Sequence, residues 1–182
     1  MSLLLSGLIL FFAVHLVPVI GSTRPWLIEK YSEPIYKSVF AVISAAGFVL
    51  MLMGKGRAEY TLLFNSPLWA GILAKIVMLP AFILLVASYY PNNIKRRVGH
   101  PMLIAVLLWS ASHLLANGDK ASVLLFGSFL LYSIVDLLSV LWRPQTTMAP
   151  VKGLNDLLVV IAGVVIYFLV FKIHGAVFAP IT

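Results

Sequence analysis

Long apolar runs separated by short polar turns dominate the pattern of hydrophobic and polar positions along the chain. Six runs stand out, at residues 3–20, 35–53, 68–89, 102–116, 121–142 and 154–171. Most approach the ~20 residues that an α-helix needs to cross a bilayer, and the fourth is somewhat shorter. The apolar positions are continuous and do not alternate over about ten residues, which disfavours a β-barrel. The pattern therefore predicts an all-α bundle of about six transmembrane helices.

The connections between these runs are brief and rich in turn-forming residues. They contain Gly21-Ser22-Thr23-Arg24-Pro25, Asn65-Ser66-Pro67, Pro91-Asn92-Asn93 and Arg143-Pro144. Because short connections usually join antiparallel neighbours, consecutive helices are expected to pack side by side. The first run lacks a basic leader and a small-residue cleavage site, so we expect it to remain a helix and not a secretory signal. Residues 1–182 are thus predicted to form a single transmembrane domain.

Composition supports this prediction and narrows the chemistry. The 182 residues are 62% hydrophobic and only 10% charged, against roughly 25% charged in an average soluble domain. There is no cysteine, which excludes thiolate nucleophiles and thiolate metal ligands. The net charge of +7 is spread over short loops and does not form one basic face, which argues against nucleic acid as a partner.

The basic residues instead indicate how the chain is oriented in the membrane. The larger group falls on one side: Arg24, Lys30, Lys37, Lys95, Arg96, Arg97, Arg143 and Lys152. The smaller group falls on the other side: Lys55, Arg57, Lys120 and Lys172. Because Lys and Arg accumulate on the cytoplasmic side, six spans would place both termini and residues 54–60 outside.

Ionisable residues inside apolar helices are costly, so each is a hypothesis about function. His15 lies in the first run and His113 in the fourth, with His100 at the start of the fourth and His174 just beyond the sixth. Two imidazoles on different helices can bind a haem from both faces. Each can instead hydrogen-bond a neighbouring helix, a contact worth about 0.6 kcal/mol. From the residues alone, packing is the simpler interpretation.

The depths of the histidines leave the choice of a ligand pair open. His15 and His113 differ in depth by on the order of 10 Å at 1.5 Å per helical residue. His15 with His100 is therefore a competing pair. His100 followed by Pro101 also fits a plain helix start, with proline at the first helical position.

The segment from His113 to Asp119 contains the most specific pattern in the chain. Asn117-Gly118-Asp119 predicts a tight turn between two helices, with Gly118 supplying a positive φ and Asp119 capping the next helix. Asn117 follows His113 by four residues, so both share a helix face and Asn117 can orient the imidazole or a bound ligand. If a haem is present, Lys55 and Arg57 are candidate partners for its propionates; otherwise they are solvated loop charges.

These motifs resemble the NnrU family of bacterial membrane proteins. The resemblance rests on His15-Leu-Val-Pro18, Gly56-Arg57-Ala58, Leu79-Pro80, His100-Pro101, Trp109, His113-Leu-Leu-Ala-Asn-Gly-Asp119 and Leu124-Leu-Phe-Gly127, and it runs to about Leu141. It implies a multi-pass protein of the bacterial inner membrane, and the distribution of basic residues then predicts periplasmic termini. The family is named for an association with denitrification and nitric oxide metabolism, and its plant relative is the haem b-dependent zeta-carotene isomerase.

Three functions follow from the resemblance and the residues together. The first is a haem b protein with His15 and His113 as axial ligands, acting in nitric oxide-linked redox metabolism or gas binding. The second is a haem-dependent carotenoid cis–trans isomerase, in which ligand switching through a thiolate cannot operate because the chain has no cysteine. The third is a haem-free small transporter or an accessory subunit of a respiratory complex. The expected partners are the lipid bilayer, an apolar small molecule or diatomic gas, and a second copy or a membrane redox partner.

Overall fold

The computed structural model describes residues 1–142 and 149–177, and this part of the chain consists of helices and connections. The helices are α1 (Ser2–Leu16), α2 (Thr23–Tyr31), α3 (Glu33–Gly56), α4 (Ala70–Tyr89), α5 (Asn93–Val98), α6 (Pro101–Ala116), α7 (Lys120–Leu141) and α8 (Gly153–Val177). All six apolar runs form helices, so the predicted all-α class is confirmed. The predicted Arg143-Pro144 turn lies outside the described residues.

Four helices are long and apolar enough to cross a membrane. These are α3, α4, α7 and α8. Helices α1 and α6 are apolar but contain only 15 and 16 residues, which corresponds to about 22 and 24 Å of helix. Their length alone therefore does not establish them as spans of a hydrocarbon core of ~30 Å. The chain is an all-helical membrane protein with at least these four candidate spans.

Two short helices, α2 and α5, were not predicted. Both are polar and lie in connections, where the apolar pattern gives no sign of a helix. Helix α5 begins where the Asn92 side chain accepts a hydrogen bond of 2.7 Å from the Lys95 N–H, a standard N-cap arrangement. The Asn92 side chain also donates to the Ala87 carbonyl at 2.9 Å, which fixes the chain as it leaves α4.

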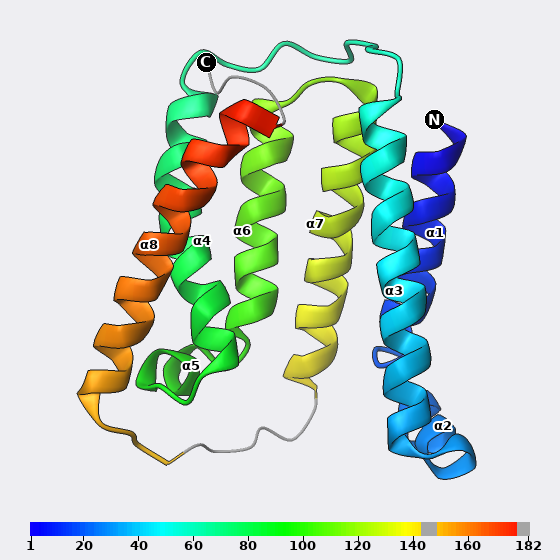
Figure 1. Ribbon diagram of the computed structural model, residues 1–182, viewed down its shortest axis with the longest axis vertical. Helices are drawn as coiled ribbons and strands as arrows, with labels where there is room; N and C mark the ends of the chain where they lie inside the picture. The colour runs from blue at the N-terminus through cyan, green and yellow to red at the C-terminus, as the bar shows by residue number, and fades with distance from the viewer. Residues whose placement is uncertain (143–148, 178–182) are drawn as a thin grey trace.

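The helices do not all pack in chain order (Figure 1). Helices α1 and α3 form one pair, α4 packs against both α6 and α8, and α7 lies between α6 and the α1/α3 pair. Among the described residues, α3 does not contact α4, and α7 does not contact α8. The prediction that consecutive helices are neighbours is wrong for these two pairs. Residues 57–69 cross the end of the bundle, and an extended segment of that length reaches about 40 Å.

Glycines bring α1 and α3 into close backbone contact. A Cβ atom on Gly7 would lie 2.6 Å from the Met51 backbone nitrogen, and one on Gly47 would lie 2.8 Å from that of Phe11. A Cβ on Gly54 would likewise overlap the backbone of Leu4. Small residues at membrane helix interfaces permit this approach, and van der Waals packing then holds the helices together.

An aromatic cluster joins the α1/α3 pair to the rest of the bundle through α7. Phe129 of α7 has its ring centroid 5.4 Å from Phe11 and 5.0 Å from Phe12 of α1. The same ring lies 5.2 Å from Trp109 of α6, nearly perpendicular to it. Such edge-to-face pairs add about 0.5–1.5 kcal/mol each beyond the burial of their area. The two parts of the bundle are therefore held in a fixed relation through α7.

Met1, the C-terminal end of α8 and residues 57–69 lie at one end of the bundle, and α2 and α5 lie at the other (Figure 1). For the described residues, this arrangement agrees with the predicted grouping of the basic loops into two sides; Arg143 lies outside them.

Candidate functional site

A cavity of about 500 Å³ opens between α4, α6 and α8, near the end of the bundle that residues 57–69 cross. Its walls are mostly apolar, and its polar lining consists of two imidazoles, one amine, one amide and one hydroxyl. The Tyr167 hydroxyl is not counted here, because it donates to the Lys75 carbonyl. The lining residues are Ser66, Pro67, Leu68, Gly71, Ala74, Lys75, Met78, Phe82, His113, Ala116, Asn117, Tyr167, Val170, Phe171 and His174.

His113 reaches this cavity from the last turn of α6. Its Nδ1 lies 2.8 Å from the Trp109 carbonyl, to which it donates a hydrogen bond. Its ring packs 4.7 Å from Phe126 and 5.3 Å from Trp109, centroid to centroid. With the proton held on Nδ1, Nε2 carries the lone pair that binds a metal or accepts a hydrogen bond.

His174 lies on the opposite wall, with its ring centroid 6.1 Å from that of His113. The apolar pattern predicted that the last helix ends just before His174, whereas α8 continues through it to Val177. The missed signal was helical spacing, because Tyr167, Phe171 and His174 recur at intervals of four and three residues. This spacing puts them on one face of α8, the face that lines the cavity.

His15 lies in different surroundings. Its Nδ1 donates to the Phe11 carbonyl at 2.8 Å, and its ring stacks on Phe11 at 3.9 Å and packs 4.8 Å from Phe40. His15 does not line the cavity, and α1 and α6 make no helix contact in the part of the chain that the structure describes. The structure thus does not bring His15 next to His113. Their joint ligation of a haem stays a prediction.

His100 lies at the other end of α6 from His113. It occupies the N-cap position, with Pro101 at the start of the helix, as the simpler interpretation of this dipeptide predicts. Thirteen residues of helix separate His100 from His113, a rise of about 20 Å. His100 therefore cannot share one small site with His113.

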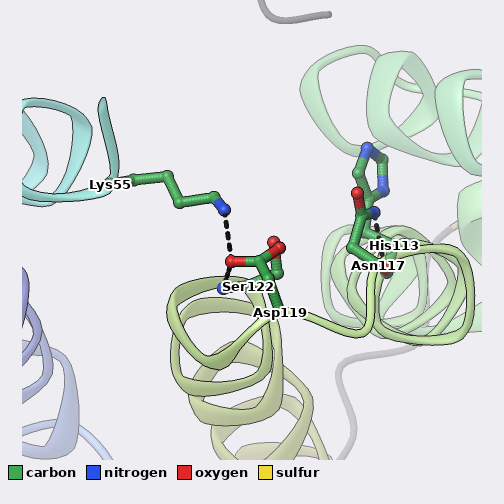
Figure 2. A network of polar contacts seen from close by, with 5 residues as sticks. All are labelled: Lys55, His113, Asn117, Asp119 and Ser122. Atoms are coloured by element: carbon green, nitrogen blue, oxygen red, sulfur yellow. Dashed lines mark hydrogen bonds and ion pairs between the residues drawn. The ribbon is translucent and has the colours of Figure 1, made fainter. Parts of the chain in front are cut away.

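Lys55 and Asp119 form an ion pair that connects α3 to α7 (Figure 2). The Lys55 Nζ lies 2.8 Å from the Asp119 Oδ1, which also accepts a hydrogen bond of 3.0 Å from the Ser122 N–H. The predicted Asp119 cap is therefore confirmed. Burial opposes ionisation of Asp119, but the hydrogen bonds from Lys55 and Ser122 outweigh it and hold the pKa of this carboxyl below its usual value. Neither Lys55 nor Arg57 lines the cavity, and their role toward a haem propionate stays a prediction.

Gly118 holds residues 57–69 across the end of the bundle. The N–H groups of Leu63 and Phe64 donate to its carbonyl at 2.8 and 3.2 Å, and the Lys120 N–H donates to the Thr61 carbonyl at 2.8 Å. Gly118 does not have a positive φ, so the reason predicted for this glycine is wrong. A Cβ at this position would overlap the Phe64 carbonyl oxygen, and the close approach of the two backbones is what requires glycine.

Asn117 closes the last turn of α6. Its side-chain amide donates to the His113 carbonyl at 2.7 Å, and Figure 2 shows it beside His113, apart from the Lys55–Asp119 pair. The contact is to the His113 backbone and not to the ring, although Asn117 also lines the cavity. The segment from His113 to Asp119 thus has two roles. His113 and Asn117 face the cavity, while Gly118 and Asp119 fasten the segment that supplies Ser66, Pro67 and Leu68 to its wall.

Lys75 of α4 and Asp136 of α7 are charged residues that lie within long apolar helices. The half-buried Lys75 lines the cavity, and within the described residues no carboxylate forms an ion pair with it. Asp136 lies on α7 and accepts a hydrogen bond of 3.0 Å from the Tyr132 hydroxyl. Lys75 is thus a cation facing a largely apolar cavity.

The fold and the cavity define a helical integral membrane protein with an internal site of cofactor size that contains two histidines. The chain matches the family model described as NnrU protein over residues 3–180, and it belongs to the NnrU family. The resemblance is therefore confirmed, and the match extends beyond Leu141 to include α8 and His174. No curated protein and no solved structure matches the chain.

Proposed function

We propose that this protein binds haem b in the cavity between α4, α6 and α8, with His113 as an axial ligand. The observation that carries the proposal is the His113 imidazole on the wall of a cavity of about 500 Å³, its Nδ1 bound to the Trp109 carbonyl. Metal-binding histidines characteristically donate their other ring N–H in this way, which fixes the tautomer and ring orientation. Cofactor sites commonly occupy about 300–1,000 Å³.

The chemistry of the lining fits a haem. Met78, Phe82 and Phe171 supply apolar walls that exclude water and suit the faces of a macrocycle. Lys75 supplies a cation for an acidic substituent of the macrocycle, and His113 supplies a neutral nitrogen donor. When bound, haem b contributes an iron that changes oxidation state and binds diatomic gases. The protein's own residues orient the His113 imidazole, keep the site apolar and bind an acidic substituent of the haem.

The role proposed for this site is redox or gas-binding chemistry linked to nitric oxide metabolism, as the family name implies. An apolar cavity next to a neutral imidazole suits a redox centre, and nitric oxide would bind the iron where one of the protein ligands is displaced. The carotenoid isomerase and the haem-free transporter or subunit are the alternative outcomes of the experiments below.

We further propose six spans, with α1 and α6 crossing the bilayer and both termini in the periplasm of a bacterial inner membrane. Local thinning of the bilayer accommodates short helices at a cost of fractions of a kcal/mol per Å. The basic residues at the end of the bundle that contains α2 and α5 support a cytoplasmic assignment for that end. Because the native chain has no cysteine, single Ser2→Cys and Asn155→Cys variants would report the two sides by labelling with a membrane-impermeant thiol reagent.

The haem proposal is tested on protein purified in detergent from cells supplied with haem. Optical spectra of the oxidised and dithionite-reduced forms and a pyridine haemochrome assay give the haem type and its stoichiometry. We expect near-stoichiometric haem b in the wild type, its loss in His113→Ala, and its retention in His100→Ala, the matched control at the other end of α6. Full haem occupancy in His113→Ala would overturn the proposal. A haem-free wild type would favour the transporter or subunit, and carotenoid turnover by the haem-loaded protein would favour the isomerase.

A further inference from the structure

The cavity presents a second imidazole that the resemblance to the NnrU family does not assign. Resting on the proposed function, we propose that His174, and not His15, is the second axial ligand of the haem, and that Lys75 binds an acidic substituent of the macrocycle. The proposal follows from the distance between two rings, from the contacts that fix α8 and from the charge in the cavity.

The distance between the rings of His113 and His174 matches two ligands of one metal ion. A metal–imidazole bond is about 2 Å long and the ring centroid lies roughly 1 Å beyond the nitrogen, so two rings on opposite faces have centroids about 6 Å apart. The observed separation is 6.1 Å. The rings come from α6 and α8, which face each other across the cavity, as a planar cofactor between them requires.

Three contacts along α8 fix the position from which His174 extends. Near its start, the Asp156 carboxylate accepts hydrogen bonds of 2.6 and 2.8 Å from the backbone and side chain of Asn93. In its middle, Gly163 packs so closely on α4 that a Cβ would lie 2.7 Å from the Ile83 Cα. Further along, the Tyr167 hydroxyl donates to the Lys75 carbonyl at 3.1 Å. Sliding or rotation of α8 would break all three, so the position of His174 is built into the fold.

His15 is held in a packing role by comparison. Phe11 covers one face of its ring at 3.9 Å, and Phe40 and Tyr132 lie at 4.8 and 5.9 Å, centroid to centroid. Its carbonyl accepts a hydrogen bond of 3.3 Å from the Tyr132 hydroxyl, which joins α1 to α7. Phe11, Phe129 and Trp109 form a continuous line of ring contacts between His15 and His113. A haem shared by His15 and His113 would have to displace these rings.

Lys75 indicates the charge of the ligand. Its side chain is half-buried at the cavity, and no Asp or Glu in the described part of the chain forms an ion pair with it. A cation beside apolar walls is stabilised by an anionic group on the ligand. The carboxylate of a haem propionate has this charge. Lys75 thus takes the role that was predicted for Lys55, which does not line the cavity and is already paired with Asp119.

The test compares His174→Ala with the matched control His15→Ala in the full-length protein. We expect the oxidised wild type to give a six-coordinate, low-spin spectrum. His174→Ala is expected to become high-spin and to retain haem at least ~10-fold less well, since loss of even an outer-shell partner costs 10–100-fold in metal affinity. Added imidazole should restore the low-spin spectrum, which a purely structural role of His174 does not predict. His15→Ala is expected to keep the wild-type spectrum.

Two further variants keep the test decisive. His174→Met retains a coordinating side chain and is expected to keep haem with a raised reduction potential, because His/Met ligation raises the potential relative to two histidines. Lys75→Met is expected to weaken haem retention without changing the spin state. A low-spin, imidazole-insensitive His174→Ala protein would overturn the inference, whether or not His15→Ala becomes high-spin. Failure of the proposed function itself is distinct, because it appears as a haem-free wild type or a haem-loaded His113→Ala variant.

Discussion

Replacing Gly118 by alanine tests why this position needs glycine. The close approach of two backbones is one reason, and an unusual φ would be another. The added methyl would overlap the Phe64 carbonyl oxygen, so residues 57–69 must move away from the turn. This movement weakens the hydrogen bonds of 2.8 and 3.2 Å that Leu63 and Phe64 donate to the Gly118 carbonyl. Because the φ of Gly118 is not positive, the alanine backbone itself is unstrained, and the whole cost comes from the displaced segment.

The size of the effect follows from these contacts. An extra methyl group in a packed site costs about 1–3 kcal/mol, and two weakened hydrogen bonds add about 1 kcal/mol each. The total of about 3–5 kcal/mol corresponds to a fall in Tm of roughly 10 °C, at about 2–4 °C per kcal/mol for a chain of this size. Ser66, Pro67 and Leu68 belong to the same segment, so the haem that we propose for this cavity should also dissociate faster.

The assay is thermal unfolding in detergent, followed by circular dichroism. The matched control is Gly127→Ala in the middle of α7, where an added Cβ meets nothing within 4 Å. Alanine there should stabilise the helix by up to about 1 kcal/mol. A Gly118→Ala protein as stable as the Gly127→Ala protein would refute the reasoning, because it would mean that the segment is not fastened to the turn.

Two other predictions follow from the same contacts. The pKa of Asp119 is lower in the folded protein than the value of about 3.9 in the unfolded chain. Its ion pair therefore stabilises the folded protein at pH values above the unfolded-state pKa. This stabilisation is lost as the pH falls through the lower folded-state pKa. The Tm of Asp119→Asn should therefore lie below that of the wild type at pH 7 by the equivalent of about 1–2 kcal/mol. This difference in Tm should become smaller below about pH 4. A difference that stays constant over this pH range would show that the ion pair does not stabilise the protein. Gly47→Leu should separate α3 from α1, because even the first added carbon would lie 2.8 Å from the Phe11 backbone nitrogen. A loss of about 1–3 kcal/mol or more in unfolding experiments is expected, whereas Gly56→Leu, in open space at the end of α3, should be nearly neutral.

The sequence predicted the helices well because each apolar run must satisfy its backbone hydrogen bonds internally in lipid. It did not predict which helices are neighbours. A turn of two or three residues forces adjacency, whereas residues 57–69 allow α4 to form next to α6 and α8 and away from α3. The contact between α4 and α8 joins segments separated by residues 90–152, and no local pattern encodes it.

The candidate site was only partly predictable for the same reason. His113 stood out because an ionisable residue in an apolar run is unusual. His174 did not, because Lys172 interrupts the apolar run and suggested that the helix had ended, although α8 continues to Val177. Lys75 was not singled out as a site residue, because only the packing of α8 on α4 shows that it borders a cavity. Gly118 was recognised as essential to a turn, but the reason depends on Phe64, a residue far away in the sequence.

The wall formed by α8 also fixes the order in which the site is completed during synthesis. Helices α1 and α3 can associate as soon as both have entered the membrane, and α6 and α7 can follow α4 in the same way. The cavity then still lacks the side that contains Tyr167, Phe171 and His174, which belong to α8 and are synthesised after α1 to α7. A chain interrupted before Gly153 would insert most of its helices and still have no enclosed site. Completion of the cavity is thus a late step, because it depends on α8.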